Sequence, residues 1–278
     1  MLAQTYAPSE IIVVDDGSTD ATPDVVGGYA GRGVKHVLLP DGKGAQAARN
    51  HGVSIAQNEW IAFQDSDDLW LPNKLEMQVE ALRARDFDER VVVHGDGVRR
   101  DEDSGVERPQ RVTYTSGRCY NDLLLRPAPL FPTILASKRA ILEAGGLDKD
   151  CPSYQEWDTA IRLARRCEFV HIQRPLFIWI WHGAETISKD QRRAVCGYDY
   201  IIKSHKEEIL SIHGQRAWRE LLVGNVVSAM AGGYWEEAGR MIAGETRRGI
   251  LPLIAFCIRM RFLPKGTTRA LGLLAKLR

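Results

Sequence analysis

The chain has 278 residues, 44% of them hydrophobic and 26% charged, which is typical of a globular protein with one substantial domain and a smaller addition. Its formal net charge of +1 lacks the strong positive balance of most nucleic-acid-binding proteins, so we expect no nucleic acid partner. The five cysteines are odd in number and form no CxxC pair. This predicts reduced thiols, and neither a disulfide framework nor a zinc site.

The positive charge is concentrated at the end of the chain. Between Arg240 and Arg278, nine lysines and arginines accompany a single acidic residue, Glu245. The opening segment, Met1 to Glu10, has no apolar stretch typical of a signal peptide, and the longest apolar run, Gly249 to Ile258, is too short to span a bilayer. We therefore expect a cytoplasmic protein that is not transmembrane and that contacts the inner face of the membrane through residues 240–278.

Apolar runs and amphipathic stretches alternate along the first two thirds of the chain. The pattern predicts strands at Glu10–Val14, Val34–Leu39, Trp60–Phe63, Val91–Val93, Thr133–Ala136 and Phe177–Trp181, and helices at Thr22–Ala30, Ala45–Gln57, Pro72–Arg85 and Tyr154–Arg166. Asp101 to Gln110 has the composition of a charged loop, and from about Lys189 the pattern is mostly helical. Alternating strands and helices favour a doubly wound α/β sheet.

Acidic residues follow two of the predicted strands, where ligands bind in open α/β sheets. Asp15 and Asp16 follow the first strand, and three carboxylates between Asp65 and Asp68 follow the third. Carboxylates repel a pyrophosphate, so such a cluster beside a nucleotide diphosphate requires a divalent cation between them. Oxygen ligands favour Mg²⁺ or Mn²⁺.

Each acidic cluster also has a structural interpretation. The first is typical of a turn in which Ser18 or Asp20 caps the helix at Thr22, and taken alone it favours that reading. The second could be a solvated turn. There we favour the functional interpretation, because carboxylates so close together resist ionising without a cation.

Several segments occur in an order that resembles the motifs of family 2 glycosyltransferases. They are Gln4–Tyr6, Glu10–Asp20, Gly44–Gly52, Phe63–Pro72, Ala144–Asp148 and Gln155–Ala164. The resemblance runs from about Leu2 to Ser188. It implies a GT-A fold over residues 1–188, with a mixed sheet and a helical, basic C-terminal extension over residues 189–278. It also implies metal-dependent, inverting transfer of a sugar from a nucleotide diphosphate sugar to a saccharide or lipid-linked acceptor, in cell-surface polysaccharide or glycolipid synthesis.

The resemblance assigns roles in donor binding to five positions. Asp15 and Asp16 would contact the base and ribose of the nucleotide. Asp67 would be the principal metal ligand, with Asp65 nearer the ribose and also in reach of the cation. Lys43 would contact the base or a phosphate, although a solvated loop lysine is an equally good interpretation.

The resemblance also places the general base at the start of a late helix, where Glu156 follows Gln155. Asp158 is the competing candidate, but it points about 200° away from Glu156 on a helix. It also has Arg162 four residues later as a surface ion-pair partner. We therefore expect Glu156 to be the base, and Trp157, Ile161 and Ala164 to lie in the core.

Two features near the last predicted strand remain open. His182 is either a further ligand of the cation or a strand-end residue with a local hydrogen bond. Trp179 and Trp181 belong either to the core or to a platform for a sugar ring.

Members of the family normally begin one strand and one helix earlier than this sequence does. We therefore expect the sheet to lack a central strand and the nucleotide pocket to lack one wall. Two other functions stay open: a nucleotidyltransferase, which also places metal-binding aspartates at strand ends, and a non-catalytic, membrane-peripheral remnant.

Overall fold

The structure is a computed structural model that describes residues 1–39, 42–181 and 190–245, together with residues 254, 255, 257, 259 and 261. The chain divides into two compact units. The first comprises Met1–Leu123, Ala128–Lys149 and Gln155–Gly183, and the second Leu124–Pro127, Asp150–Tyr154 and Ala184–Arg278.

All strands of the described residues lie in the first unit. They are β1 (Ile11–Asp15), β2 (Val34–Leu38), β3 (Trp60–Ala62), β4 (Leu69–Trp70), β5 (Val91–Asp101), β6 (Glu107–Gln110), β7 (Leu135–Ser137) and β8 (Glu168–Trp181). Its helices are α1 (Thr22–Gly27), α2 (Ala45–Ile55), α3 (Lys74–Arg83), α4 (Tyr120–Leu123), α5 (Lys138–Glu143) and α6 (Gln155–Ala164), with 3₁₀ turns at Ala30–Arg32 and Phe131–Thr133. Each predicted strand and helix is present, and most of their ends shift by one to three residues.

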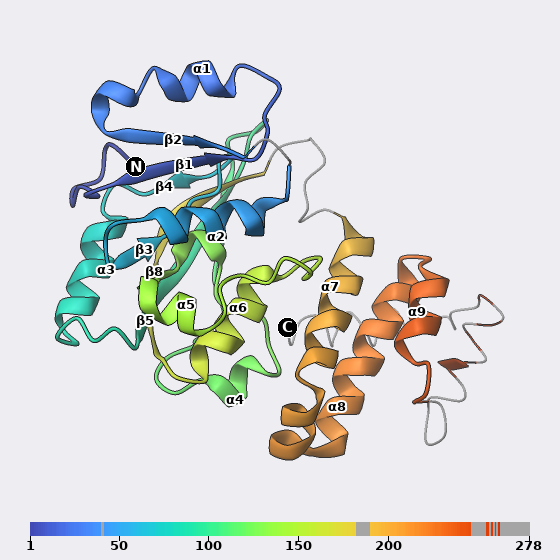
Figure 1. Ribbon diagram of the computed structural model, residues 1–278. Coiled ribbons are helices and arrows are strands. Elements are labelled where there is room, and N and C mark those ends of the chain that lie inside the picture. Colours follow the sequence, from blue (N-terminus) through green and yellow to red (C-terminus); the bar gives the residue numbers. More distant parts are fainter. Residues whose placement is uncertain are drawn as a thin grey trace. The chain divides into compact units, whose positions relative to one another are not determined.

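The strands form a mixed arrangement, as the sequence predicts (Figure 1). β1 and β2 pair in parallel as a two-stranded sheet. The larger sheet has the order β3-β7-β5-β8-β4, and β6 pairs with β5 outside that path. β5 and β8 run parallel, whereas β3 is antiparallel to β7 and β4 is antiparallel to β8.

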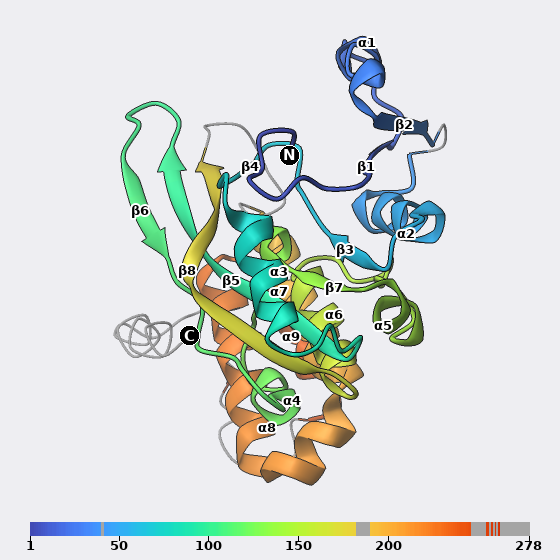
Figure 2. The same ribbon diagram turned by 90° about the vertical axis from the view of Figure 1, so that its left-hand side faces the viewer.

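In the part of the chain that the structure describes, no strand pairing joins the two sheets, and β1 and β3 each have one unpaired edge. Within the described residues β1 pairs only with β2, and β3 pairs with β7 on one side only (Figure 2). The middle of β1, Ile12–Val14, is therefore half-buried, although its apolar sequence predicts burial on both faces. The Glu10 carboxylate accepts a hydrogen bond from the Gln57 backbone at 3.0 Å, which ties together the chain segments that lead into β1 and β3.

The core of the larger sheet is built from aliphatic side chains of α3 and the strands. Leu82, Val91, Val93 and Leu135 are buried together, and Trp60 packs against them. This cluster is the expected result of apolar strands beneath an amphipathic helix.

Helix α6 packs through the face that its periodicity predicts. Trp157, Ile161 and Ala164 are 0%, 1% and 6% exposed, which confirms them as core residues. The Trp157 indole donates a hydrogen bond to the Leu123 carbonyl at 2.6 Å. The helix start, which carries Glu156, is thereby held in a defined orientation.

The prediction of a loop throughout Asp101–Gln110 was wrong. β5 continues to Asp101, and Glu107–Gln110 forms β6, which pairs antiparallel with it. The ribbon is exposed and carries no apolar face, so the alternation that usually reveals a strand is missing. An ion pair between Arg100 and Glu107, at 2.6 Å, joins the two strands instead.

The second unit is helical, as the pattern after residue 189 predicts. Its helices in the described residues are α7 (Gln191–Ser204), α8 (Lys206–Ala231) and α9 (Trp235–Met241). None of the helices in the described part of the chain is long and apolar enough to cross a membrane. Most of the basic segment 240–278 lies outside the described residues.

Candidate active site

The acidic cluster after β3 forms a closed loop. The Gln64 side-chain amide donates to the carbonyls of Asp65 and Asp68, at 2.7 and 2.6 Å. The Asp68 backbone also donates to the Asp65 carbonyl at 3.2 Å. These hydrogen bonds fix the backbone of the turn that carries the carboxylates of Asp65, Asp67 and Asp68.

Asp68 is a half-buried carboxyl group beside two other carboxylates. Burial is the largest of the causes that raise its pKa to about 7; the charges of Asp65 and Asp67 contribute to the increase, and a backbone hydrogen bond from Ile180 opposes it. The repulsion from Asp65 and Asp67 thus contributes less than burial does. A bound cation would relieve it.

Arg49 of α2 binds this loop, although the sequence predicted no role for it. Its guanidinium forms an ion pair with Asp65 and lies over the Phe131 ring, 4.3 Å from the centroid. Phe131 in turn contacts Phe63, with 4.7 Å between ring centroids. The available signal was an arginine directly after the buried Ala48, on the inner face of an amphipathic helix.

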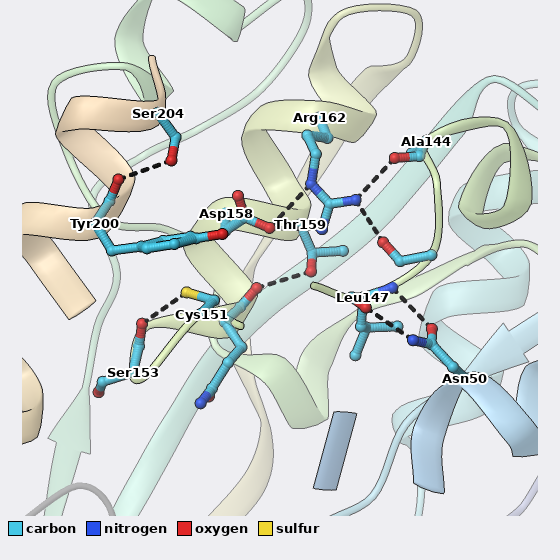
Figure 3. Close-up of polar contacts among 12 residues, drawn as sticks. Asn50, Ala144, Leu147, Cys151, Ser153, Asp158, Thr159, Arg162, Tyr200 and Ser204 are labelled. Carbon is cyan, nitrogen blue, oxygen red and sulfur yellow. Dashed lines mark hydrogen bonds and ion pairs between the residues drawn. The ribbon is translucent and has the colours of Figure 1, made fainter. Parts of the chain in front are cut away.

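The neighbouring Asn50 anchors α2 to the turn before α6 (Figure 3). Its side chain donates to the Leu147 carbonyl at 2.7 Å and accepts from the Leu147 amide at 2.8 Å. Gly146 permits this approach, since it has a φ of +72° and a Cβ there would lie 2.8 Å from the Asn50 Oδ1 atom. Two of the motifs quoted above therefore meet in the fold.

Glu156 lies in the first turn of α6 and is electrostatically linked to the acidic loop. Burial is the main cause that raises its pKa to about 7; the charge of Asp65 contributes to the increase, whereas its own backbone N–H and the Arg49 guanidinium oppose it. The structure therefore brings Glu156 into the same electrostatic environment as Asp65 and Arg49. A carboxyl group with a pKa near neutrality is suited to accept a proton at physiological pH.

Asp158 has a different environment, because its carboxylate is neutralised by an ion pair. It is bonded by Arg162 at 2.5 and 2.9 Å, and the same guanidinium donates to the carbonyls of Ala144 and Gly146 (Figure 3). The predicted ion pair is present. Its predicted surface position was wrong, because Asp158 is 3% exposed. The packing of α6 brings this face of the helix inside the unit.

Asp15 and Asp16 both take part in loop hydrogen bonds. The Asp15 carboxylate accepts from the Ser18 backbone at 2.8 Å, which lowers its pKa, and His36 Nε2 lies 3.3 Å away. Asp16 accepts from the backbone amides of Lys43 and Gly44, at 2.9 and 2.6 Å. The loop after β1 is thus joined to the turn that begins α2, and Lys43 lies in that turn.

Ser18 and Asp20 were the two predicted caps of α1. Only Asp20 forms a hydrogen bond with the start of that helix. The Asp20 carboxylate accepts from the amide of Thr22, the first residue of α1, at 2.9 Å. Ser18 does not cap the helix: its backbone N–H donates to Asp15, and the N-cap position of α1 is Ala21.

A cation at the acidic loop would have Asp65 and Asp67 as its protein ligands. The described residues contain no cluster of three or more His, Cys, Asp or Glu side chains arranged for a metal ion. Magnesium-type sites in enzymes that bind phosphates often use one or two carboxylates and complete their shell with water and substrate phosphate. The two aspartates fit such a site. His182, the third predicted ligand, lies outside the described residues.

Comparison with known proteins assigns the domain that carries this site. The sequence model of Glycosyl transferase family 2 matches residues 1–138. Residues 1–138 belong to family 2 of the glycosyltransferases. This glycosyltransferase domain includes the loop after β1, the α2 motif and the acidic loop.

Curated relatives match about a third of the chain. UDP-Glc:alpha-D-GlcNAc-diphosphoundecaprenol beta-1,3-glucosyltransferase WfgD of Escherichia coli is 43% identical over 82 residues, 30% of this chain and 32% of its own length. The putative teichuronic acid biosynthesis glycosyltransferase TuaG of Bacillus subtilis is 40% identical over 87 residues, 31% of this chain and 34% of its own. The match thus spans about a third of each relative.

Solved structures share the fold over most of the chain. The mannosyltransferase PcManGT from Pyrobaculum calidifontis, in complex with GDP-Man and Mn²⁺, is 20% identical, with a TM-score of 0.55 over 98% of this chain and 74% of that one. TarS from S. aureus, in complex with UDP, is 16% identical, with a TM-score of 0.51 over 93% and 80%. The predicted GT-A fold is confirmed.

Proposed function

We propose that the protein transfers a sugar from a nucleotide diphosphate sugar to an acceptor hydroxyl, with inversion and with the help of Mg²⁺ or Mn²⁺, in cell-surface polysaccharide or glycolipid synthesis. The observation that carries the proposal is the convergence of Asp65, Arg49 and Glu156, which joins the acidic loop to a carboxyl group of raised pKa. The donor class is supported by the UDP and GDP-Man in the structures of similar fold.

The acidic loop would bind the donor's diphosphate through a cation held by Asp67 and Asp65. Such a cation neutralises the charge that develops on the departing diphosphate. Arg49 would keep Asp65 oriented, since its guanidinium is itself positioned by the Phe131 ring. Asp15 and Asp16 would contact the base and ribose, with Lys43 close to Asp16.

Glu156 would remove the proton from the acceptor hydroxyl as that oxygen attacks the anomeric carbon. A single attack of this kind, on the face opposite the leaving diphosphate, inverts the anomeric configuration. Asp158 is less suited to be the base, because its carboxylate is already held in the buried ion pair with Arg162.

The acceptor we propose is a saccharide, carried on a lipid when the enzyme works at the inner face of the membrane. The name of the E. coli relative WfgD includes a diphosphoundecaprenol-linked GlcNAc. The basic segment 240–278 would supply attraction to anionic lipid.

Product analysis tests the proposal against the nucleotidyltransferase alternative. UDP-glucose and GDP-mannose are incubated with the protein and Mn²⁺, UTP with glucose 1-phosphate and GTP with mannose 1-phosphate are incubated in parallel, and the products are separated. A glycosyltransferase releases UDP or GDP from these donors, by slow hydrolysis when no acceptor is present. A nucleotidyltransferase instead releases pyrophosphate from a nucleoside triphosphate and sugar phosphate. Pyrophosphate release without any nucleoside diphosphate would overturn the proposal.

A further inference from the structure

One row of side chains crosses three neighbouring strands at the far end of the larger sheet. Arg99 of β5 is paired with Arg108 of β6 and with Trp179 of β8. Directly paired residues of adjacent strands lie on the same face of a sheet. The close approach of Gly97 to Phe177, two positions earlier in the same pairing, agrees with this, because a Cβ on Gly97 would lie 2.5 Å from the Phe177 ring.

The row places the positive charges of Arg99 and Arg108 beside each other, with little negative charge to offset them. Cross-strand neighbours of like charge destabilise a sheet. No ion pair or hydrogen bond of the Arg99 or Arg108 guanidinium occurs within the described residues. The Asp101 carboxylate has its pKa lowered mainly by hydrogen bonds from Ser104, with smaller contributions from the charges of Arg99 and Arg108. It accepts from the backbone and hydroxyl of Ser104, at 2.9 and 2.6 Å, and so belongs to the hairpin turn.

Two tryptophans complete the same face. The Arg99 guanidinium lies 5.0 Å from the centroid of the Trp181 ring. Trp179 and Trp181 meet edge to face, with 5.2 Å between their centroids. Both are half-buried and neither is a core residue. Of the two interpretations that the sequence left open, the structure favours the platform.

The position of this face links it to the acidic loop. Ile180, between the two tryptophans, donates its backbone N–H to the Asp68 carboxylate at 3.2 Å. Figure 2 shows β6, the end of β5 and β8 side by side. The row therefore borders the loop in which we place the donor's diphosphate and cation.

We propose that Arg99, Arg108, Trp179 and Trp181 form an acceptor subsite for a pyranose carried on a phosphate or diphosphate. Tryptophan rings offer an apolar face to a sugar ring. Guanidinium groups bind phosphate oxygens through paired, charge-assisted hydrogen bonds. A phosphate between Arg99 and Arg108 would also remove the repulsion between them. The proposal rests on the proposed function and names its acceptor class.

Direct binding tests the subsite without requiring turnover. The probes are short-chain alkyl diphosphate glycosides of glucose, galactose and N-acetylglucosamine, each matched by an alkyl glycoside that lacks the diphosphate. We expect the wild type to bind at least one diphosphate probe about tenfold or more tighter than its match. The double variant R99M/R108M should lose that preference, and R99K/R108K should keep most of it.

Arg100→Met is the matched control, because Arg100 is the next residue of the same strand, points to the opposite face and is paired with Glu107. It should keep the preference for diphosphate. Trp179→Ala should weaken both members of a probe pair to the same degree, about tenfold, because it removes only the sugar platform. A wild type without preference, or an equal loss in Arg100→Met, would overturn the proposal.

Donor hydrolysis on the same variants separates this proposal from the function on which it rests. The hairpin variants should hydrolyse donor within about twofold of wild type, because their residues lie outside the acidic loop. If the wild type hydrolyses donors but binds all probes equally, the subsite fails and the function stands. If it hydrolyses no donor yet shows the predicted binding pattern, the transfer function fails and the subsite stands.

Discussion

Glu156 links activity to pH at the scale of a single residue. Burial raises its pKa from the model-compound value of 4.5 to about 7. A general base acts in its ionised form, so the transfer rate should rise with pH through about 7, or slightly below when a cation favours the carboxylate.

The raised pKa of Glu156 also affects stability, because the folded state keeps this proton to a higher pH than the unfolded chain does. The residue therefore lowers stability as the pH rises from 4.5 to 7, and Glu156→Gln should remove that loss. Rate profiles and denaturant unfolding across this pH range check both effects.

Exchanging the two acidic residues of α6 distinguishes a base from a positioning group. Glu156→Gln should keep nucleotide binding and lower transfer by roughly 10²–10⁴-fold, the usual contribution of general base catalysis. Asp158→Asn should cost less transfer per folded molecule. It should instead lower the free energy of unfolding by about 3–5 kcal/mol, because it leaves Arg162 without its buried partner. Kinetics and unfolding are measured on both variants. An essential Asp158 beside a dispensable Glu156 would reverse the assignment.

The prediction of a divalent cation at the acidic loop depends mainly on Asp67. If it holds the cation, Asp67→Asn should lower donor turnover by roughly 10²-fold or more, through lost stabilisation of the leaving group. Chelator should have a comparable effect on the wild type and little further effect on the variant. Asp103→Asn, on the exposed hairpin turn, is the control and should behave as wild type. Turnover that survives both chelator and Asp67→Asn would remove the metal assignment.

At the scale of elements, β1 and β3 each leave one strand edge unpaired within the described residues. Unpaired edges promote association between molecules, and half-buried apolar strands leave stabilising burial unused. Adding an N-terminal segment that supplies an apolar strand and a helix should raise the melting temperature and the affinity for UDP or GDP. The control extension carries proline within the strand, which cannot complete the hydrogen-bond ladder. Equal stability and affinity in all three forms would show that the sheet does not take up a further strand.

At the scale of the whole molecule, the uneven charge predicts behaviour at a membrane. The segment 240–278 carries nine basic residues and one acidic residue. Each basic residue near an anionic bilayer contributes up to about 1 kcal/mol of attraction, which salt screens. We expect sedimentation with anionic vesicles at low salt, release at high salt, and little binding to neutral vesicles. A chain ending at residue 239 is the comparison. Equal partitioning to both kinds of vesicle, or to neither, would contradict the prediction.

Local patterns were sufficient to predict most of the longer strands and helices in their order, the acidic loop after β3 and the core face of α6; they missed the short elements β4, α4 and α5. The features that were predicted depend on periodicity and on residues close together in the chain. Three-dimensional packing alone determined which charges meet. Arg49, Asp65 and Glu156 come from three separate elements, so their proximity is absent from any local pattern. The β6 hairpin escaped prediction for a related reason: an exposed, charged ribbon has no apolar face, and only its pairing with β5 makes it a strand.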